Sequence, residues 1–295
     1  MDDLEDLVAV LAGRRLAVLT GAGVSTDSGI PDYRGPDSPP RNPMTFQQFV
    51  SDERFRRHYW ARNQVGWRHV ATRYPNDGHR ALAELEAAGV VVGVVTQNVD
   101  MLHQAAGSRR VVDLHGTYRD VVCLRCGTRY TREEVGRRLD ELNPGFVERI
   151  GEVGDVEIAP DADAVIERTA DFVVAACWAP DDRGNGSAPG ADLSPRSDGL
   201  CGGILKPDIV YFGETVPPAR VAAAYAVVDE AEALLVAGSS LAVQSGLRFV
   251  RHAAAAGKPI GIVNRGTTRG DRFAAVRVHA GTSQTLRALV GRLSP

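Results

Sequence analysis

Residues 15–25 have the sequence RLAVLTGAGVS, in which an apolar run leads directly into a glycine-rich segment. The run from Arg15 to Thr20 predicts a buried strand, and the two glycines predict a tight turn after it. A strand followed by such a turn is typical of nucleotide sites in open parallel sheets, because glycine lets the backbone approach a pyrophosphate and the next helix offers free N–H groups. Thr26 stands where the third glycine of the dinucleotide fingerprint is expected, so these residues alone leave an ordinary strand-to-helix turn as the alternative.

The alternation of helices and strands continues on both sides of a long interruption. Apolar runs predict further strands at residues 90–96, 111–114, 233–237, 259–263 and 276–278, and helices are expected at 4–12, 80–88, 218–231, 243–256 and 283–293. Alternation of this kind favours a parallel sheet with helices on its faces. We therefore expect an α/β fold with a Rossmann-like parallel sheet.

Two segments depart from this alternation. Residues 41–77 are predicted to be a helical insertion, because a polar, aromatic helical stretch begins at Thr45. Residues 118–203 contain all four cysteines and are predicted to form a small zinc-binding module, in which residues 178–200 are poor in hydrophobic side chains and are expected to be mobile. The Rossmann-like domain then comprises residues 1–40, 78–117 and 204–295.

Polar side chains follow the predicted strands at positions that a ligand could reach. Asp32 and Arg34 lie in the loop after the glycine turn, residues 97–100 (QNVD) follow the second strand, and His115 follows the third. The carboxyl ends of parallel strands meet at one edge of a sheet, where ligands of open α/β sheets bind. A single histidine at a strand end is more often structural than catalytic, so His115 gains a chemical role only from these neighbours.

Taken together, these motifs resemble those of the sirtuin family. The shared segments occur in the family's order and are GAGVS (21–25), GIPDYR (29–34), TQNVD (96–100), LHG (114–116), KPDIVYFGE (206–214), GSSL (238–241) and IVN (262–264). The resemblance extends from about residue 14 to the C-terminus. The segments YWARN (59–63) and AGSRR (106–110) resemble the bacterial class II branch.

The resemblance implies an enzyme, an NAD-dependent protein-lysine deacylase (deacetylase) that releases nicotinamide and O-acyl-ADP-ribose. Its partners would be acylated lysine side chains of proteins or peptides. A protein ADP-ribosyltransferase that uses the same NAD site is the first alternative, and a non-enzymatic NAD- or zinc-dependent binding module is the second. Tyr59 and Arg62 have the spacing of the Tyr–Arg pair of desuccinylating relatives, but they belong to the class II segment, so neutral acyl groups, acetyl or longer, are expected.

The resemblance also implies roles for individual residues. His115 would be the general base, because an imidazole titrates near neutral pH and can take a ribose hydroxyl proton, and Asn98 and Asp100 would complete the catalytic group. Peptide binding would use Val210, Phe212, Gly213 and Glu214. The residues expected to bind NAD are Gly21, Ala22, Gly23, Ser25, Asp32, Tyr33, Arg34, Gln97, Asn98, Asp100, Gly238, Ser239, Ser240, Asn264, Arg265, Gly266 and Thr282.

The cysteines predict one structural zinc ion. Cys123 and Cys126 have the two-residue spacing of a zinc half-site. The family usually supplies a second close pair, whereas here Cys177 and Cys201 are separated by 23 residues, with no histidine between 116 and 251 to replace either one. Closing the longer loop costs roughly 2 kcal/mol, and a structural zinc site contributes about 10–16 kcal/mol. We therefore expect all four thiolates to bind zinc, with two unrelated buried thiols as the alternative.

Composition limits the remaining classes of function. The net charge of −3 gives no basic surface for direct nucleic acid binding. The longest apolar run, about residues 90–95, is too short to span a membrane, and the acidic N-terminus is unlike a signal or transit peptide. A cytoplasmic location is therefore expected.

Overall fold

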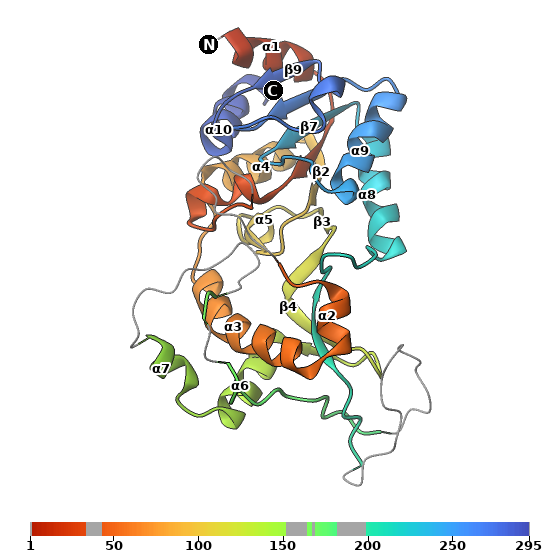
Figure 1. The fold of residues 1–295 in the computed structure, drawn as a ribbon. Coiled ribbons are helices and arrows are strands. Elements are labelled where there is room, and N and C mark those ends of the chain that lie inside the picture. The colour runs from red at the N-terminus through yellow and green to blue at the C-terminus, as the bar shows by residue number, and fades with distance from the viewer. Residues whose placement is uncertain (1, 34–42, 152–163, 167–168, 182–198, 295) are drawn as a thin grey trace. The chain divides into compact units, whose positions relative to one another are not determined.

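Two compact units make up the chain. The computed structural model describes residues 2–33, 43–151, 164–166, 169–181 and 199–294 (Figure 1). The first unit comprises residues 1–41, 73–115 and 216–295, and the second comprises residues 42–72 and 116–215. Among the described residues, no helix combines the length and the apolar composition needed to cross a bilayer.

The first unit is built on a six-stranded sheet in which every pairing is parallel. Its strands are β1 (Leu16–Thr20), β2 (Val91–Thr96), β3 (Val111–Asp113), β7 (Ala233–Ala237), β8 (Ile260–Val263) and β9 (Val276–Val278). Their spatial order is β3-β2-β1-β7-β8-β9. Within this unit the order is 3-2-1-4-5-6, the Rossmann order, and its direction reverses between β1 and β7.

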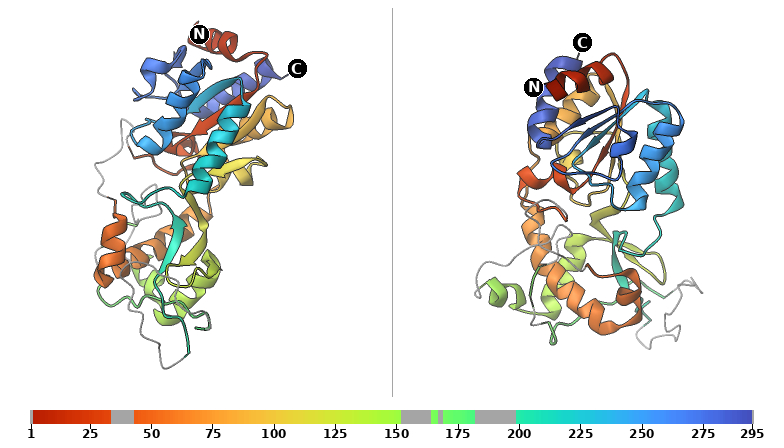
Figure 2. Two further views of the ribbon diagram at one scale, coloured as in Figure 1. Left: turned by 90° about the vertical axis from the view of Figure 1, so that its right-hand side faces the viewer. Right: turned by 45° about the horizontal axis from the view of Figure 1, so that its top comes forward.

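Helices cover both faces of this sheet (Figures 1 and 2). One face carries α1 (Asp2–Leu11), α4 (Asp77–Ala87) and α10 (Thr282–Leu293), whose leucines are buried against β1, β2 and β7 in one core cluster. The other face carries α8 (Pro218–Glu230) and α9 (Gln244–Ala255). Short helices are α5 (Leu102–Ala105), η1 (Ala22–Val24), η2 (Thr26–Ser28) and η3 (Asp271–Phe273). The prediction of an α/β fold with a parallel Rossmann-like sheet is confirmed.

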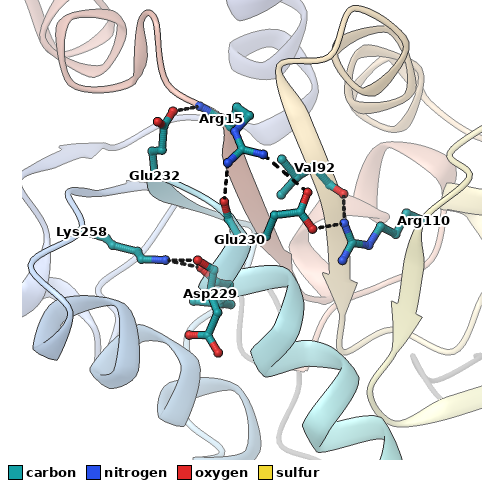
Figure 3. Close-up of polar contacts among 8 residues, drawn as sticks. Arg15, Val92, Arg110, Asp229, Glu230, Glu232 and Lys258 are labelled. Atoms are coloured by element: carbon teal, nitrogen blue, oxygen red, sulfur yellow. Dashed lines mark hydrogen bonds and ion pairs between the residues drawn. The ribbon is translucent and has the colours of Figure 1, made fainter.

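Ion pairs and backbone contacts join the amino ends of the strands in the first unit (Figure 3). Arg15, just before β1, donates its backbone N–H to the Glu232 carboxylate (2.8 Å) and its guanidinium to the Glu230 carbonyl (3.1 Å). The Arg110 guanidinium binds the Glu230 carboxylate and the Val92 carbonyl. Because these residues precede or begin four different strands or end α8, the contacts hold neighbouring strands in register.

The second unit contains a three-stranded antiparallel sheet in the order β5-β4-β6. Its strands are β4 (Gly116–Cys123), β5 (Arg129–Thr131) and β6 (Leu205–Ile209), and its helices are α2 (Phe46–Ser51), α3 (Glu53–Ala71), α6 (Arg132–Leu142) and α7 (Phe146–Gly151). The Arg132 guanidinium is fully buried between the rings of Trp60 and Trp67, each 5.5 Å away. It donates hydrogen bonds to Asn63 and Gln64, so α3 and α6 share one polar core.

Residues 204–215 differ from the sequence-based assignment. They were expected in the Rossmann-like domain. Instead, β6 ends at Ile209 and pairs antiparallel with β4, which places these residues in the second unit. The chain turns after β6 because the Tyr211 N–H donates to the Glu214 carboxylate (2.9 Å) and the Glu214 N–H donates to the Tyr211 carbonyl (3.0 Å).

Candidate functional site

The glycine turn after β1 packs directly on the turn after β7. A Cβ atom on Gly21 would lie 2.8 Å from the Ser239 Cβ, and one on Gly23 would lie 2.9 Å from the Gly238 Cα. Gly238 has φ +63°, and its own Cβ would lie 2.4 Å from the Val24 backbone nitrogen. The three glycines therefore allow a backbone approach that no side chain permits, at the switch point where open α/β sheets bind ligands. We refer to the two turns at residues 21–23 and 238–239 as the cradle, where the sequence predicts that a pyrophosphate binds.

The hydroxyl group of Ser25 joins the glycine turn to the segment after β2. It donates to the Asp100 carboxylate (2.7 Å) and accepts from the Asn98 side-chain amide (3.1 Å). His79 completes the group, because its Nδ1 accepts from the Asn76 backbone N–H and its Nε2 is therefore the protonated nitrogen, 3.4 Å from the Ser25 Oγ. All three hydrogen-bonding positions of the hydroxyl are thus used.

A buried histidine pair lies behind this hydroxyl. The rings of His79 and His103 are 4.8 Å apart, and the His103 Nε2 lies 2.9 Å from the Thr20 hydroxyl. Burial lowers the pKa of His79 to about 4 and that of His103 well below its ordinary value of 6.5. Both rings are therefore neutral at pH 7. No local pattern connects His79 with Ser25, since 53 residues separate them.

The Gln97 side chain connects the end of β2 to the end of β7. Its amide nitrogen donates to the Ser239 hydroxyl (2.7 Å) and to the Thr20 carbonyl (3.2 Å). Its backbone carbonyl accepts a hydrogen bond from His115, which follows β3 (2.9 Å). Gln97 therefore links the predicted phosphate side of the site to the predicted base through one residue.

The His115 imidazole is held through both of its nitrogens. Nδ1 lies 2.9 Å from the Gln97 carbonyl and Nε2 lies 2.8 Å from the Ser245 hydroxyl. Burial lowers the pKa of His115, the hydrogen bond to Gln97 opposes this shift, and the positive charge of Arg220 adds to it. The imidazole is therefore neutral at pH 7, the state that a general base requires. No motif in the sequence singled out Ser245.

The remaining residues predicted to bind NAD lie around the same edge of the sheet. The Thr282 hydroxyl, at the start of α10, donates to the Gly23 carbonyl (3.1 Å). Asn264 follows β8 and donates its side-chain amide to the Gly266 carbonyl (2.9 Å), and the Arg265 guanidinium lies 3.9 Å from the Asp27 carboxylate. Ser240 accepts a backbone hydrogen bond from Arg269. Ala22, Asp32 and Tyr33 are partly buried after β1, and Arg34 lies outside the described residues.

The predicted peptide-binding loop has a defined conformation within the second unit. The Phe212 carbonyl accepts from the Phe46 backbone N–H (2.9 Å), and Gly213 has φ +78°. The Glu214 carboxylate accepts from the buried Lys206 ammonium (3.0 Å), which also donates to the Ile209 carbonyl (2.6 Å). The carboxylate of Glu214 thus shapes the loop, whereas Val210, next to it, is partly exposed.

The four cysteines form one cluster in the second unit. Their sulfur atoms all lie within 4.8 Å of one another. Cys123 is 3.7 Å from Cys201, and Cys126 is 3.7 Å from Cys177. A hydrogen bond from Cys123 lowers the pKa of Cys177 to about 5. Four thiols this close together are a donor set that fits a structural zinc ion.

Antiparallel pairing explains how distant cysteines become neighbours. The Cys177 N–H donates to the Gly203 carbonyl, and the Cys201 N–H donates to the Ala179 carbonyl, both at 2.9 Å. Pro180 and Leu200 form a further bridge. The two ends of the segment between Cys177 and Cys201 are therefore paired with each other. The ends of the segment predicted to be mobile (178–200) are thus ordered. Its residues 182–198 lie outside the described residues.

Comparisons with known proteins agree with this geometry. The model of the Sir2 family matches residues 21–245. The chain is 59% identical over 290 residues to NAD-dependent protein deacetylase 1 of Mycobacterium avium (strain 104), covering 98% of this chain and 95% of that protein. It is 46% identical over 293 residues to NAD-dependent protein deacetylase 1 of Streptomyces coelicolor, covering 99% and 90%.

Solved structures give the same result. One described as "Sir2-p53 peptide-NAD+" matches with a TM-score of 0.65 and 27% identity, covering 98% of this chain and 97% of that chain. Another, described as "Structural Basis for the Mechanism and Regulation of Sir2 Enzymes", has a TM-score of 0.69 and 27% identity, covering 99% and 98%. Because the family model and full-length relatives agree, the chain belongs to the Sir2 family.

Proposed function

We propose that the chain is an NAD-dependent protein deacetylase that acts on acylated lysine side chains. The observation that carries the proposal is the continuous set of hydrogen bonds from Ser239 through Gln97 to His115, which joins the pyrophosphate cradle to a neutral imidazole. The names of the relatives and a solved structure described as "Sir2 bound to acetylated peptide" support the substrate class.

The residues of the first unit have distinct roles in this proposal. Gly21, Gly23 and Gly238 bring the backbone close to the pyrophosphate of NAD, and Ser239 binds phosphate. Asn98 and Asp100, oriented by Ser25, surround the nicotinamide and its ribose. NAD supplies the ADP-ribose that accepts the acyl group. With NAD bound, the His115 Nε2 would accept the proton of a ribose hydroxyl.

The second unit binds the peptide and the zinc ion. The loop from Val210 to Glu214 offers backbone groups to an extended peptide, in the manner of strand addition. Zinc held by all four cysteines has no free coordination position, so it stabilises the fold and takes no part in the chemistry. Removing it with a chelator should unfold the second unit, since a structural zinc site contributes about 10–16 kcal/mol. Metal analysis confirms that the zinc has been removed. An unchanged circular dichroism spectrum of the zinc-free protein would refute this role.

We also propose a cytoplasmic location and a preference for neutral acyl groups. Four clustered thiols favour metal binding in a reducing compartment over disulfides. The acyl preference is tested by comparing kcat/KM for acetyl-, succinyl-, lipoyl- and myristoyl-lysine peptides. A preference for succinyl-lysine would contradict it.

The reaction itself is tested with purified protein, an acetyl-lysine peptide and NAD labelled in the adenosine part. Deacetylation yields free lysine, nicotinamide and labelled O-acetyl-ADP-ribose in equal amounts, as measured by liquid chromatography and mass spectrometry. Label that stays on protein, with no O-acetyl-ADP-ribose, would instead indicate an ADP-ribosyltransferase. NAD that is neither bound nor consumed would contradict both activities.

A further inference from the structure

The hydroxyl group of Ser245 contacts the nitrogen of His115 on which the proposed chemistry depends. Ser245 is in the first turn of α9, 130 residues from His115 in the sequence, and its Oγ lies 2.8 Å from the His115 Nε2. It belongs to none of the motifs that bind NAD or peptide in the proposal above.

The protonation state of the ring follows from its two partners. The Gln97 carbonyl can only accept a hydrogen bond, so the Nδ1 nitrogen, 2.9 Å away, carries the proton. A neutral imidazole has one protonated nitrogen, which leaves a lone pair on Nε2. Ser245 therefore donates its hydroxyl proton to that lone pair. Nε2 is also the atom that must take the proton of a ribose hydroxyl.

The first turn of α9 is built to approach this side of the site closely. A Cβ atom on Gly246 would lie 2.5 Å from the Gln97 Oε1, so any larger residue there would displace the Gln97 side chain. That side chain is fixed by Ser239 and by the Thr20 carbonyl. Gly246 thus brings α9 close enough for Ser245, its neighbour in the sequence, to reach the imidazole.

We propose that Ser245 is a positioning residue for His115, a proposal that rests on the role of His115 as the base. Two hydrogen bonds, one at each nitrogen, fix the ring plane and direct the Nε2 lone pair before the substrate arrives. Ser245 is partly exposed. Rotation about its Cα–Cβ bond therefore moves the hydroxyl away when a ribose hydroxyl takes its place. Without Ser245 the ring is held only at Nδ1 and can rotate about the Gln97 contact.

The test compares Ser245→Thr with Ser245→Val, because threonine and valine have the same shape and only threonine keeps the hydroxyl. The Val variant should lose about 3- to 10-fold in kcat, the effect of one neutral hydrogen bond, with KM for the acetyl peptide unchanged. Exchange of labelled nicotinamide into NAD, which precedes the proton transfer at His115, should keep its rate. The Thr variant should retain most of the activity, and Gln244→Ala, in the same helical turn, should match the wild type.

A second measurement uses the protein without NAD or peptide. In 15N spectra of the histidine rings, a hydrogen bond accepted by Nε2 shifts its resonance upfield. The His115 Nε2 resonance should therefore move downfield in the Val variant and stay in place in the Thr variant. If wild-type protein failed to deacetylate any peptide, the proposed function would fall, and this spectrum would still show whether Ser245 donates to His115.

Three outcomes would overturn the positioning role. The Val and Thr variants could have equal kcat, nicotinamide exchange could fall in parallel with deacetylation, or the His115 Nε2 resonance could be the same in both variants. The first two outcomes would mean that Ser245 contributes to the fold or to NAD binding and does not position His115. The third would show that its hydroxyl does not bind the imidazole.

Discussion

The two edges of the parallel sheet in the first unit hold very different sets of side chains. At the amino edge, exposed arginines and carboxylates pair with each other, as Arg15 and Arg110 do with Glu230 (Figure 3). At the carboxyl edge, partly buried neutral groups such as Gln97 and His115 are connected through hydroxyls and carbonyls. Exposed ion pairs contribute little to the free energy of unfolding. Buried hydrogen bonds fix geometry and are costly to leave unmade.

The difference teaches how one sheet serves both stability and chemistry. The arginines and carboxylates named above pair with each other at the amino edge, so these charges do not form a ligand site. The glycine turns at the carboxyl edge bring two stretches of backbone together at the switch point, where open α/β sheets bind ligands. Four substitutions or conditions should separate the two edges.

The largest effect is expected from His115→Ala at the carboxyl edge. Deacetylation should fall about 10²- to 10⁴-fold, the usual contribution of a general base. Tm should change little, because the ring is only partly buried. Initial rates and differential scanning fluorimetry measure the two quantities. His279→Ala, at an exposed position, is the matched control and should keep full activity. Equal rates for the two variants would remove His115 from the mechanism.

The next effect is expected from Gly23→Ala. The new Cβ would lie 2.9 Å from both the Cα and the carbonyl oxygen of Gly238, which are backbone atoms that cannot rotate away. Overpacking of this kind costs about 1–3 kcal/mol. The strain is relieved by moving the two turns apart, so the Kd for NAD should rise about 5- to 150-fold. Isothermal titration calorimetry gives the Kd. Gly291→Ala, where the Cβ meets nothing within 4 Å, should bind NAD like the wild type. Unchanged affinity in Gly23→Ala would argue against the cradle.

Lowering the pH should weaken the carboxyl edge before the amino edge. His79, His103 and His115 have folded pKa values below the ordinary 6.5, so they contribute stability that is complete above pH 6.5 and is lost as pH falls toward their folded values, about 4 for His79. The hydrogen bond from Arg110 lowers the pKa of Glu230, so its contribution is lost only as pH falls below 4.5.

Histidine and carboxylate titrations by NMR, together with Tm between pH 4 and 8, check this order. Activity should be flat near neutral pH and fall only below pH 6.5, where His115 begins to bind a proton. If lowering the pH reduced activity already above pH 7, the pKa of His115 would be raised. That result would contradict the lowering of its pKa by burial.

The smallest effect is expected from Glu230→Gln at the amino edge. The change removes exposed ion pairs to Arg15 and Arg110. Tm should fall by at most about 2 °C, and less at high salt, because exposed pairs are screened by water and ions. kcat and Kd for NAD should not change. A marked loss of NAD affinity would show that the two edges are coupled.

The sequence was sufficient for the parts of the fold that depend on local pattern. Continuous apolar runs gave the strands of the parallel sheet, and the glycines at 21 and 23 gave the turn at its switch point. The family resemblance supplied His115 and the strand-end motifs. The structure brings Ser25, Asn98, Asp100 and His115 to the same edge because parallel strands end together.

Contacts between distant segments could not be predicted in the same way. Nothing local distinguishes Ser245 from other serines at helix starts, and its partner is 130 residues away. The antiparallel pairing of β6 with β4 overrides the expectation that β6 belongs with the Rossmann strands that follow it. Cys177 and Cys201 were assigned to one zinc ion by their residue type, but the hydrogen bonds from the backbone of each cysteine to a residue near the other were not foreseen.

Hydrogen–deuterium exchange of the full chain, with and without NAD, tests the central comparison most directly. NAD should slow exchange at residues 21–25, 97–100 and 238–240, which follow β1, β2 and β7. It should leave the amides of residues 15, 110 and 230–232 unchanged. Protection confined to the amino edge, or no protection at either edge at saturating NAD, would contradict the account.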